Sequence, residues 1–228
     1  MPNCHQISAA QLRRWELALS LDDLKRLSRI SAAGRAMQFV AGRALLAAMI
    51  ERYIGSDVLL SVEPSGKPVL SRGACSVAHS GSGITVALSC SDDLSFGVDI
   101  EQPKKRDYMA VAKSYFHIDE FEKLQSMAGS AQQSLFFSLW VQKEALAKCL
   151  GKSVLSVLGK DVAVEANKRQ LVGYVGRNKQ FFFSLVANCD SFPIVQVQTF
   201  NEANQCYQAT PVEVLPASNY VNLVKFTN

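Results

Sequence analysis

The sequence predicts an α+β fold in which helices precede strands twice along the chain. Apolar residues recur with helical spacing over residues 32–54 and 131–150. Short apolar or alternating runs bounded by glycine and proline occupy residues 58–101 and 161–200. Helix-rich and strand-rich stretches are thus segregated. This order favours an α+β domain over the strict alternation that builds a parallel sheet.

In the first half, residues 8–30 and 32–54 are predicted to be helices, and Gly55 is a natural stop for the second of them. Turns at residues 64–66 and 81–83 are expected to separate short strands. The strands predicted here are residues 58–62, 68–70, 75–79, 84–89 and 95–101.

The second half repeats the order. Residues 108–115, 120–127 and 131–150 are predicted to be helical, and Gly151 ends the last helix. Residues 161–200 are expected to return to strands, at residues 162–164, 181–187 and 194–200.

Composition favours a folded enzyme or binding protein over a nucleic-acid-binding chain. Of 228 residues, 48% are hydrophobic and 19% are charged, with a net charge of +4. The charges are interspersed except at residues 104–106, which read KKR and are typical of a solvated loop. A nucleic-acid partner is not expected without a clustered basic face, whereas an acidic partner or an anionic ligand fits the mild positive charge.

The sequence also predicts a cytoplasmic protein with free thiols and no membrane partner. The six cysteines lack zinc-site spacing. The first 20 residues carry Arg13, Arg14 and Glu16 where a signal peptide has its apolar core. No apolar run approaches the roughly 20 residues of a membrane helix.

Two carboxylates alternate along the predicted strand at residues 97–101, which read GVDIE. Side chains alternate on a strand, so Asp99 and Glu101 share one face and are opposite to Val98 and Ile100. Paired carboxylates repel each other, and a hard cation such as Mg²⁺ is their natural partner. Two ordinary acids at a solvent-facing strand end are the alternative reading.

A second group lies on the predicted helix 131–150. Trp140, Glu144 and Lys148 are spaced by four residues and share one stripe, with Lys143 beside it. Glu144 is a candidate third metal ligand, and Lys148 is a candidate phosphate contact. A surface Glu–Lys pair with an amphipathic tryptophan is the alternative.

Two weaker signals come from predicted turns. His79 and Ser80 end a predicted strand, where the imidazole is placed to donate to a phosphate oxygen or to serve a structural role. Lys67 and Pro68 follow Gly66 in a turn, where the ammonium faces either a phosphate or solvent.

The order of these segments resembles the Sfp-type family of 4′-phosphopantetheinyl transferases. The segments are GKP at residues 66–68, HSG at 79–81, GVDIE at 97–101 and WVQKEALAK at 140–148. The segment FVAGR at residues 39–43 extends the resemblance upstream, and residues 115–120, which read YFHIDE, resemble the aromatic-plus-glutamate segment before the family's catalytic helix. The resemblance covers most of the chain except its C-terminal quarter.

The resemblance implies two similar α+β halves related by pseudo-twofold symmetry, with the active site in the cleft between them. Residues 1–96 would serve the nucleotide side of coenzyme A, and residues 97–228 would carry the metal and the catalytic helix. A monomer would suffice.

The implied reaction moves the phosphopantetheine arm of coenzyme A onto a serine of an acyl, peptidyl or polyketide carrier protein, leaving adenosine 3′,5′-bisphosphate. Asp99, Glu101 and Glu144 would bind Mg²⁺, although Mn²⁺ also suits these ligands. Glu144 or a metal-bound water would be the base, and Lys148 would assist catalysis at the phosphates.

Coenzyme A contacts implied by the resemblance come from both halves, and they are Arg26, Lys67, Pro68, His79, Ser80, Lys143 and Lys148. One departure concerns Gln38, which stands where many relatives carry an arginine. That phosphate contact is then either missing or supplied by Arg35.

Three rival readings stay open. One is a non-catalytic relative that binds coenzyme A or a carrier protein. Another is a different magnesium enzyme such as a nuclease, which the absence of a basic stripe disfavours. The third is an adaptor domain, which leaves the stripe of Trp140, Glu144 and Lys148 without a reason.

Overall fold

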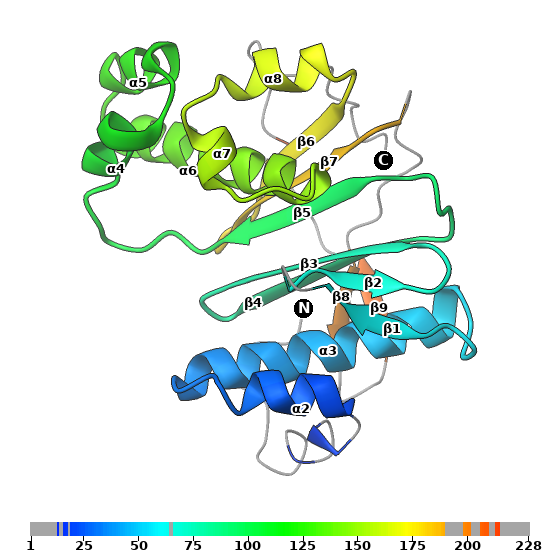
Figure 1. The fold of residues 1–228 in the computed structure, drawn as a ribbon. Helices are drawn as coiled ribbons and strands as arrows, with labels where there is room; N and C mark the ends of the chain where they lie inside the picture. Colours follow the sequence, from blue (N-terminus) through cyan, green and yellow to red (C-terminus); the bar gives the residue numbers. More distant parts are fainter. Residues whose placement is uncertain are drawn as a thin grey trace. The chain divides into compact units, whose positions relative to one another are not determined.

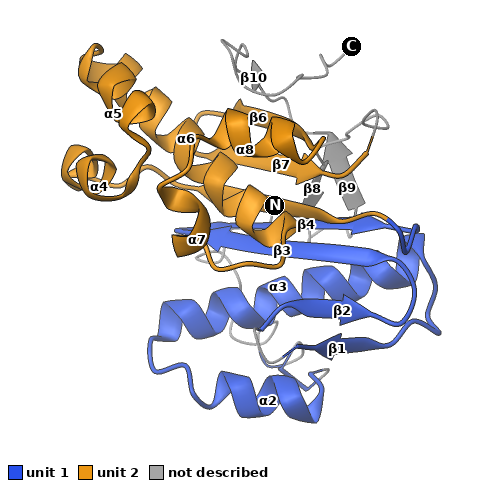
Figure 2. Cartoon of the chain, turned by 45° about the horizontal axis from the view of Figure 1, so that its top comes forward, with its two compact units in different colours: residues 1–93, 197–210 blue, residues 94–196, 211–228 orange. Residues whose placement is uncertain are grey.

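The structure is a computed structural model that describes residues 19–63 and 66–189, together with the single residues 13, 16 and 17. It also describes the backbone of the short strands 198–201, 206–209 and 213–214. The chain divides into two compact units, residues 1–93 with 197–210 and residues 94–196 with 211–228 (Figure 2). The predicted pseudo-twofold relation and the division into residues 1–96 and 97–228 stay predictions.

Unit 1 combines helices with antiparallel hairpins (Figure 1). Its elements are α2 (Leu21–Leu27), α3 (Ala33–Tyr53), β1 (Leu60–Val62), β2 (Pro68–Leu70), β3 (Ala74–Ser80), β4 (Gly83–Ser89), β8 (Gln198–Asn201) and β9 (Cys206–Ala209). The pairs are β1–β2, β3–β4 and β8–β9. The apolar stripe of α3 packs on the sheet residues Ile84, Leu70 and Cys75. The helix predicted at residues 32–54 is therefore present as α3, and its apolar stripe forms part of the core of unit 1.

Unit 2 is a four-stranded antiparallel sheet with helices. Its strands are β5 (Phe96–Glu101), β6 (Val172–Arg177), β7 (Phe182–Ala187) and β10 (Glu213–Val214), in the order β10-β6-β7-β5. Its helices are α4 (Tyr108–Tyr115), α5 (Ile118–Gln125), α6 (Gly129–Cys149), α7 (Leu155–Leu158) and α8 (Val162–Lys168). Together the two units confirm the α+β class. None of the described helices is long and apolar enough to span a bilayer.

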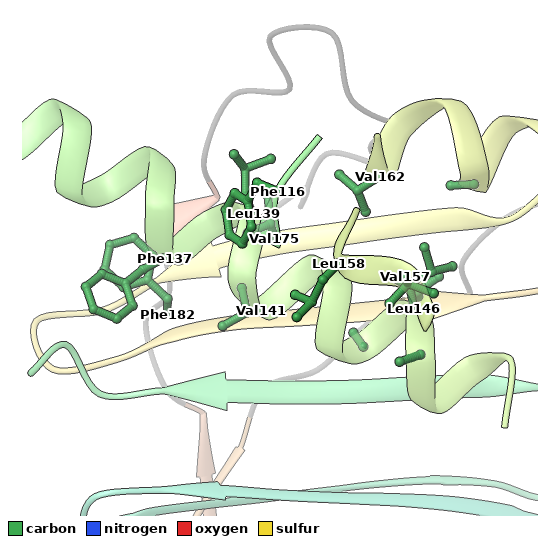
Figure 3. Close-up of a cluster of buried hydrophobic side chains, with 14 of the residues drawn as sticks. Phe116, Phe137, Leu139, Val141, Leu146, Val157, Leu158, Val162, Val175 and Phe182 are labelled. Carbon is green, nitrogen blue, oxygen red and sulfur yellow. The ribbon is translucent and has the colours of Figure 1, made fainter. Parts of the chain in front are cut away.

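Helix α6 lies against one face of the unit 2 sheet and forms the centre of its core. Side chains of α6, such as Phe137 and Leu146, meet those of α7, α8, β6 and β7 in one buried cluster (Figure 3). Burial of such apolar area is the main stabilising term for the unit, at about 25 cal/mol per Å².

Residues 162–164 form the start of α8, so the predicted strand there is wrong. Asp161 caps this helix, because its Oδ1 accepts hydrogen bonds from the backbone N–H groups of Ala163 and Val164, both at 2.9 Å. The apolar run of Val162 and its neighbours suggested a strand, but the cap outweighs the β-branched residues. Strand β6 escaped prediction because Gly173 and Gly176 interrupt its pattern.

Predictions at the chain ends extend outside the described residues. Of the predicted helix 8–30, the structure describes α2 and a few single residues. Of the predicted strand 194–200, it describes β8 from residue 198.

Gly97 allows α6 to lie directly on β5. A Cβ atom added to Gly97 would meet the backbone oxygen of Ala145 and the backbone nitrogen of Cys149, and would lie 2.7 Å from Lys148 Cβ. The backbone of α6 therefore leaves no room for a methyl group at this position. Glycine is therefore required here by close approach and not by an unusual backbone angle.

We predict that Gly97→Ala lowers the free energy of unfolding by about 1–3 kcal/mol, because overpacking forces α6 away from β5. Gly34→Ala is the control, since a Cβ at Gly34 meets nothing within 4 Å. Urea denaturation monitored by circular dichroism measures both variants. Equal stability of the Gly97 variant and the wild type would contradict the close approach.

Candidate functional site

The stripe predicted on the helix at residues 131–150 is present on α6. From residue 140 to residue 149, Trp140, Glu144 and Lys148 are half-buried, and the residues between them are buried. Repetition of partial exposure every four residues is expected for one edge of a helix whose other faces are packed. The three side chains therefore line the one accessible edge of this part of α6.

Asp99 and Glu101 lie on the face of β5 that α6 covers. Gly97 contacts α6, and residues 97, 99 and 101 share a face by alternation. The Lys148 ammonium donates to Asp99 Oδ1 at 2.8 Å and to the Val98 carbonyl oxygen at 3.0 Å. Residues 49 positions apart in the sequence are thus joined across the helix–strand contact.

The carboxyl groups of Asp99 and Glu144 both have raised pKa values. Burial raises the pKa of Asp99 to about 7, the Lys148 charge opposes this shift, and Glu144 and then Glu101 add to it. Burial also raises the pKa of Glu144, against the Lys148 charge and with a contribution from Glu101. Acids that influence one another in this way gain from a nearby cation.

The site fits a hard divalent cation by its donor chemistry. Asp99 is 6% exposed, and its Oδ2 is buried with no hydrogen-bond partner among the described residues. Carboxylate oxygens are the ligands that Mg²⁺ prefers. However, no group of three or more His, Cys, Asp or Glu side chains in the described part of the chain is close enough to hold an ion. Asp99, Glu101 and Glu144 would have to draw together around it.

Lys143 is not placed to bind coenzyme A, which corrects the prediction for this residue. Its side chain is fully buried, and its Nζ lies 2.7 Å from Glu120 Oε2. The same ammonium donates to the Lys160 carbonyl oxygen, and Glu120 Oε1 accepts from the Val162 N–H at 3.0 Å. The Glu120–Lys143 pair therefore fastens α5 and the start of α8 to α6.

Arg26 and the turn before Lys67 and Pro68 meet in unit 1. The Arg26 guanidinium donates to the Gly66 carbonyl oxygen at 3.3 Å. Helix α2 is held on α3 by a buried ion pair in which Arg43 Nε lies 2.8 Å from Asp23 Oδ1. The arginine of the FVAGR segment thus anchors the helix that carries Arg26. Its role was not predicted, because its partner lies on another helix.

Arg35 and Gln38 lie close to the turn that follows His79 and Ser80. The Arg35 guanidinium lies 3.1 Å from His79 Nδ1 and 3.0 Å from His79 Nε2. Gln38 donates to the Gly81 carbonyl oxygen at 2.6 Å, next to Ser80, which is buried. Gln38 therefore supports the turn, and Arg35 supplies the cation beside His79. Ligand binding by these residues stays a prediction.

Comparison with known proteins identifies a matching family. A family profile described as the 4′-phosphopantetheinyl transferase superfamily matches residues 95–196. This segment contains Asp99, Glu101, Glu144 and Lys148.

Curated relatives carry the same description. The chain is 32% identical to the 4′-phosphopantetheinyl transferase psf-1 of Bacillus pumilus over 54% of this chain and 57% of that protein. It is 29% identical to HetI of a Nostoc species over 68% and 69%, and 30% identical to AcpT of Salmonella typhimurium over 56% and 65%. The matched part of the chain thus spans a little over half to about two thirds of the length of these relatives.

We predict that Lys143→Met destabilises the chain by about 3–5 kcal/mol, because it leaves the Glu120 charge buried without its partner. The double variant with Glu120→Leu should recover part of this loss, since both charges are gone. Denaturant unfolding measures the series. A stable Lys143→Met variant with weakened coenzyme A binding would instead support the coenzyme A contact that was predicted for Lys143 from the sequence.

We further predict that the metal-free chain loses stability as the pH rises from about 4 to 7. The pKa of Asp99 is raised from 3.8 to about 7 in the folded state. At Asp99 the folded state therefore binds more protons than the unfolded state in this window, so the contribution of this group to the free energy of unfolding falls as the pH rises. Asp99→Asn should lack this component. The test is to measure the free energy of unfolding of the wild type and of Asp99→Asn at pH 5 and pH 8 in EDTA. An equal change between the two pH values in both proteins would contradict the prediction.

Proposed function

We propose, from the premise that this chain belongs to the 4′-phosphopantetheinyl transferase superfamily, that it transfers the 4′-phosphopantetheine group of coenzyme A to a serine of a carrier protein. The observation that carries this proposal is the contact of Lys148 with Asp99, beside Glu144 and Glu101. A cation and three carboxylates on one helix–strand contact suit the transfer of a phosphoryl-linked group.

Asp99, Glu101 and Glu144 are the proposed ligands of Mg²⁺. The bound ion would supply charge neutralisation on the pyrophosphate of coenzyme A. The orphaned Oδ2 of Asp99 and the mutual repulsion of the acids support this assignment.

Glu144 is the proposed general base. Burial raises its pKa, which makes its carboxylate a better proton acceptor than a solvated glutamate. Glu144 takes the proton of the carrier serine hydroxyl as the oxygen attacks the β-phosphorus of coenzyme A. The bond between the β-phosphorus and the oxygen that bridges to the α-phosphorus breaks, and adenosine 3′,5′-bisphosphate leaves.

Lys148 is the proposed partner of the leaving phosphate. Its side chain is 32% exposed, so a phosphate oxygen reaches the ammonium at the accessible edge of α6. The same ammonium donates to Asp99 Oδ1 at 2.8 Å.

The nucleotide of coenzyme A is proposed to bind unit 1. Arg26, Lys67 and Pro68 would contact it near the Gly66 turn, and His79 and Ser80 would contact its phosphates. The contacts of Arg26 with Gly66 and of Arg35 with His79 support this grouping.

The proposed protein partner is an acidic acyl, peptidyl or polyketide carrier. A net charge of +4 favours encounter with it. Tyr115 and Ile118 are exposed at the junction of α4 and α5, whereas Phe116 is buried in the core. A cytoplasmic location and a monomeric state remain predictions from the sequence.

Intact-protein mass spectrometry tests the transfer. Apo carrier proteins of the acyl and peptidyl kinds are incubated with the chain, coenzyme A and Mg²⁺, with EDTA as the control. A metal-dependent mass gain of one phosphopantetheinyl group supports the proposal. No gain with a folded chain that still binds coenzyme A would favour a binding-only relative.

We predict that Glu144→Gln lowers the transfer rate by about 10²–10⁴-fold, because the amide neither accepts the serine proton nor carries charge for the metal. Glu122→Gln is the matched control, since Glu122 is exposed on α5. Circular dichroism should show both variants folded. Normal transfer by the Glu144 variant would remove Glu144 from the mechanism.

A further inference from the structure

Two buried polar atoms lie opposite each other on neighbouring strands of unit 2. Ser184 of β7 pairs directly with Asp99 of β5 in the antiparallel register. Ser184 is 2% exposed and Asp99 is 6% exposed. Ser184 Oγ and Asp99 Oδ2 both lack a hydrogen-bond partner among the described residues.

Both side chains lie on the face of the sheet that α6 covers. Directly opposed residues of an antiparallel pair project to the same face, and their Cβ atoms lie about 4.5–5.5 Å apart. Asp99 projects toward α6, as its contact with Lys148 requires. Ser184 is therefore the directly opposed neighbour of Asp99 on this face, and its χ1 angle decides whether the hydroxyl points toward the carboxylate.

The chemistry of the two atoms is complementary. A hydroxyl carries one donor, and a carboxylate oxygen accepts. Lys148 already occupies Asp99 Oδ1, which leaves Oδ2 as the acceptor without a donor. On its other side Ser184 is paired with Val175, whose side chain offers no acceptor. Buried polar atoms are nearly always hydrogen-bonded in folded proteins, so Asp99 is the partner that its register gives to Ser184.

We propose that Ser184 is a positioning residue whose hydroxyl donates to Asp99 Oδ2 and fixes the carboxylate in the orientation that binds a divalent cation. This inference rests on the proposed function, because it takes Asp99 as a metal ligand. Each carboxylate oxygen has two lone pairs, so Oδ2 accepts the hydroxyl and still has a lone pair for an ion. Metal-binding carboxylates are usually held by such hydrogen bonds. No motif of the sequence points to Ser184.

Titration of the purified full-length chain with Mn²⁺, followed by electron paramagnetic resonance of the free ion, tests the inference without any transfer reaction. We expect Ser184→Ala to weaken Mn²⁺ binding by about tenfold, as loss of a hydrogen bond to a ligating group does elsewhere. Ser184→Thr, which keeps the hydroxyl, should bind like the wild type. In an Asp99→Asn background, Ser184→Ala should have no further effect.

Ser138→Ala is the matched control. Ser138 is also a buried serine of this unit, but its hydroxyl donates to the Ser134 carbonyl oxygen within α6. Its loss should leave Mn²⁺ affinity unchanged, and thermal unfolding of every variant shows that the fold is retained.

The outcomes separate this inference from the proposed function. If the wild type binds Mn²⁺ and Ser184→Ala binds it equally well, the role of Ser184 is overturned and the metal site stands. If the wild type does not bind Mn²⁺, the metal roles of Asp99 and Ser184 are both overturned. If Ser138→Ala weakens binding as much as Ser184→Ala, the effect is general loosening of the core and the inference fails.

Discussion

The approach of α6 to β5 at Gly97 is the constraint on which the candidate site depends. Because Gly97 has no side chain, the helix backbone lies against the strand and the Lys148 ammonium reaches Asp99 Oδ1 at 2.8 Å. The same approach buries Asp99 and raises its pKa. A wider separation would let water enter, weaken the influence of Glu144 on Asp99, and turn the site into separate surface groups. The chemistry proposed for the site is thus set by a packing distance.

The two lysines of α6 show how the rotation of a helix assigns roles. Lys143 and Lys148 differ by five residues, which places their side chains on different sides of the helix. Lys143 points into the core, where its ammonium lies 2.7 Å from Glu120 Oε2. Lys148 lies at the accessible edge with Glu144. The buried Glu120–Lys143 pair is costly to desolvate, but it holds α6 in the rotation that leaves Trp140, Glu144 and Lys148 half-buried at the accessible edge.

Features confined to one element were predictable from the sequence, and features that join elements were not. The four-residue spacing of the α6 stripe and the alternation that puts Asp99 and Glu101 on one face depend only on helix and strand geometry. Lys143 was assigned wrongly because its partner Glu120 lies on another helix. The pairing of Arg43 with Asp23, and the register of Ser184 with Asp99, likewise follow from tertiary structure. The strand predicted at residues 162–164 failed for a local reason, because the capping residue Asp161 outweighed a short β-branched run.

The balance of charge at the site indicates what kind of ligand the arrangement suits. Burial and neighbouring carboxylates raise the pKa values of Asp99 and Glu144, and within the described residues Lys148 is the cation that opposes these shifts. For folding alone this surplus is unfavourable, since burial and like charges both resist ionisation. Replacing Asp99 with an apolar or neutral residue would remove part of this surplus of negative charge. A further bound cation, such as the divalent ion proposed for this site, would offset this surplus. The unfavourable electrostatics of these buried carboxyl groups therefore argue for the proposed chemistry more directly than the identity of any single residue does.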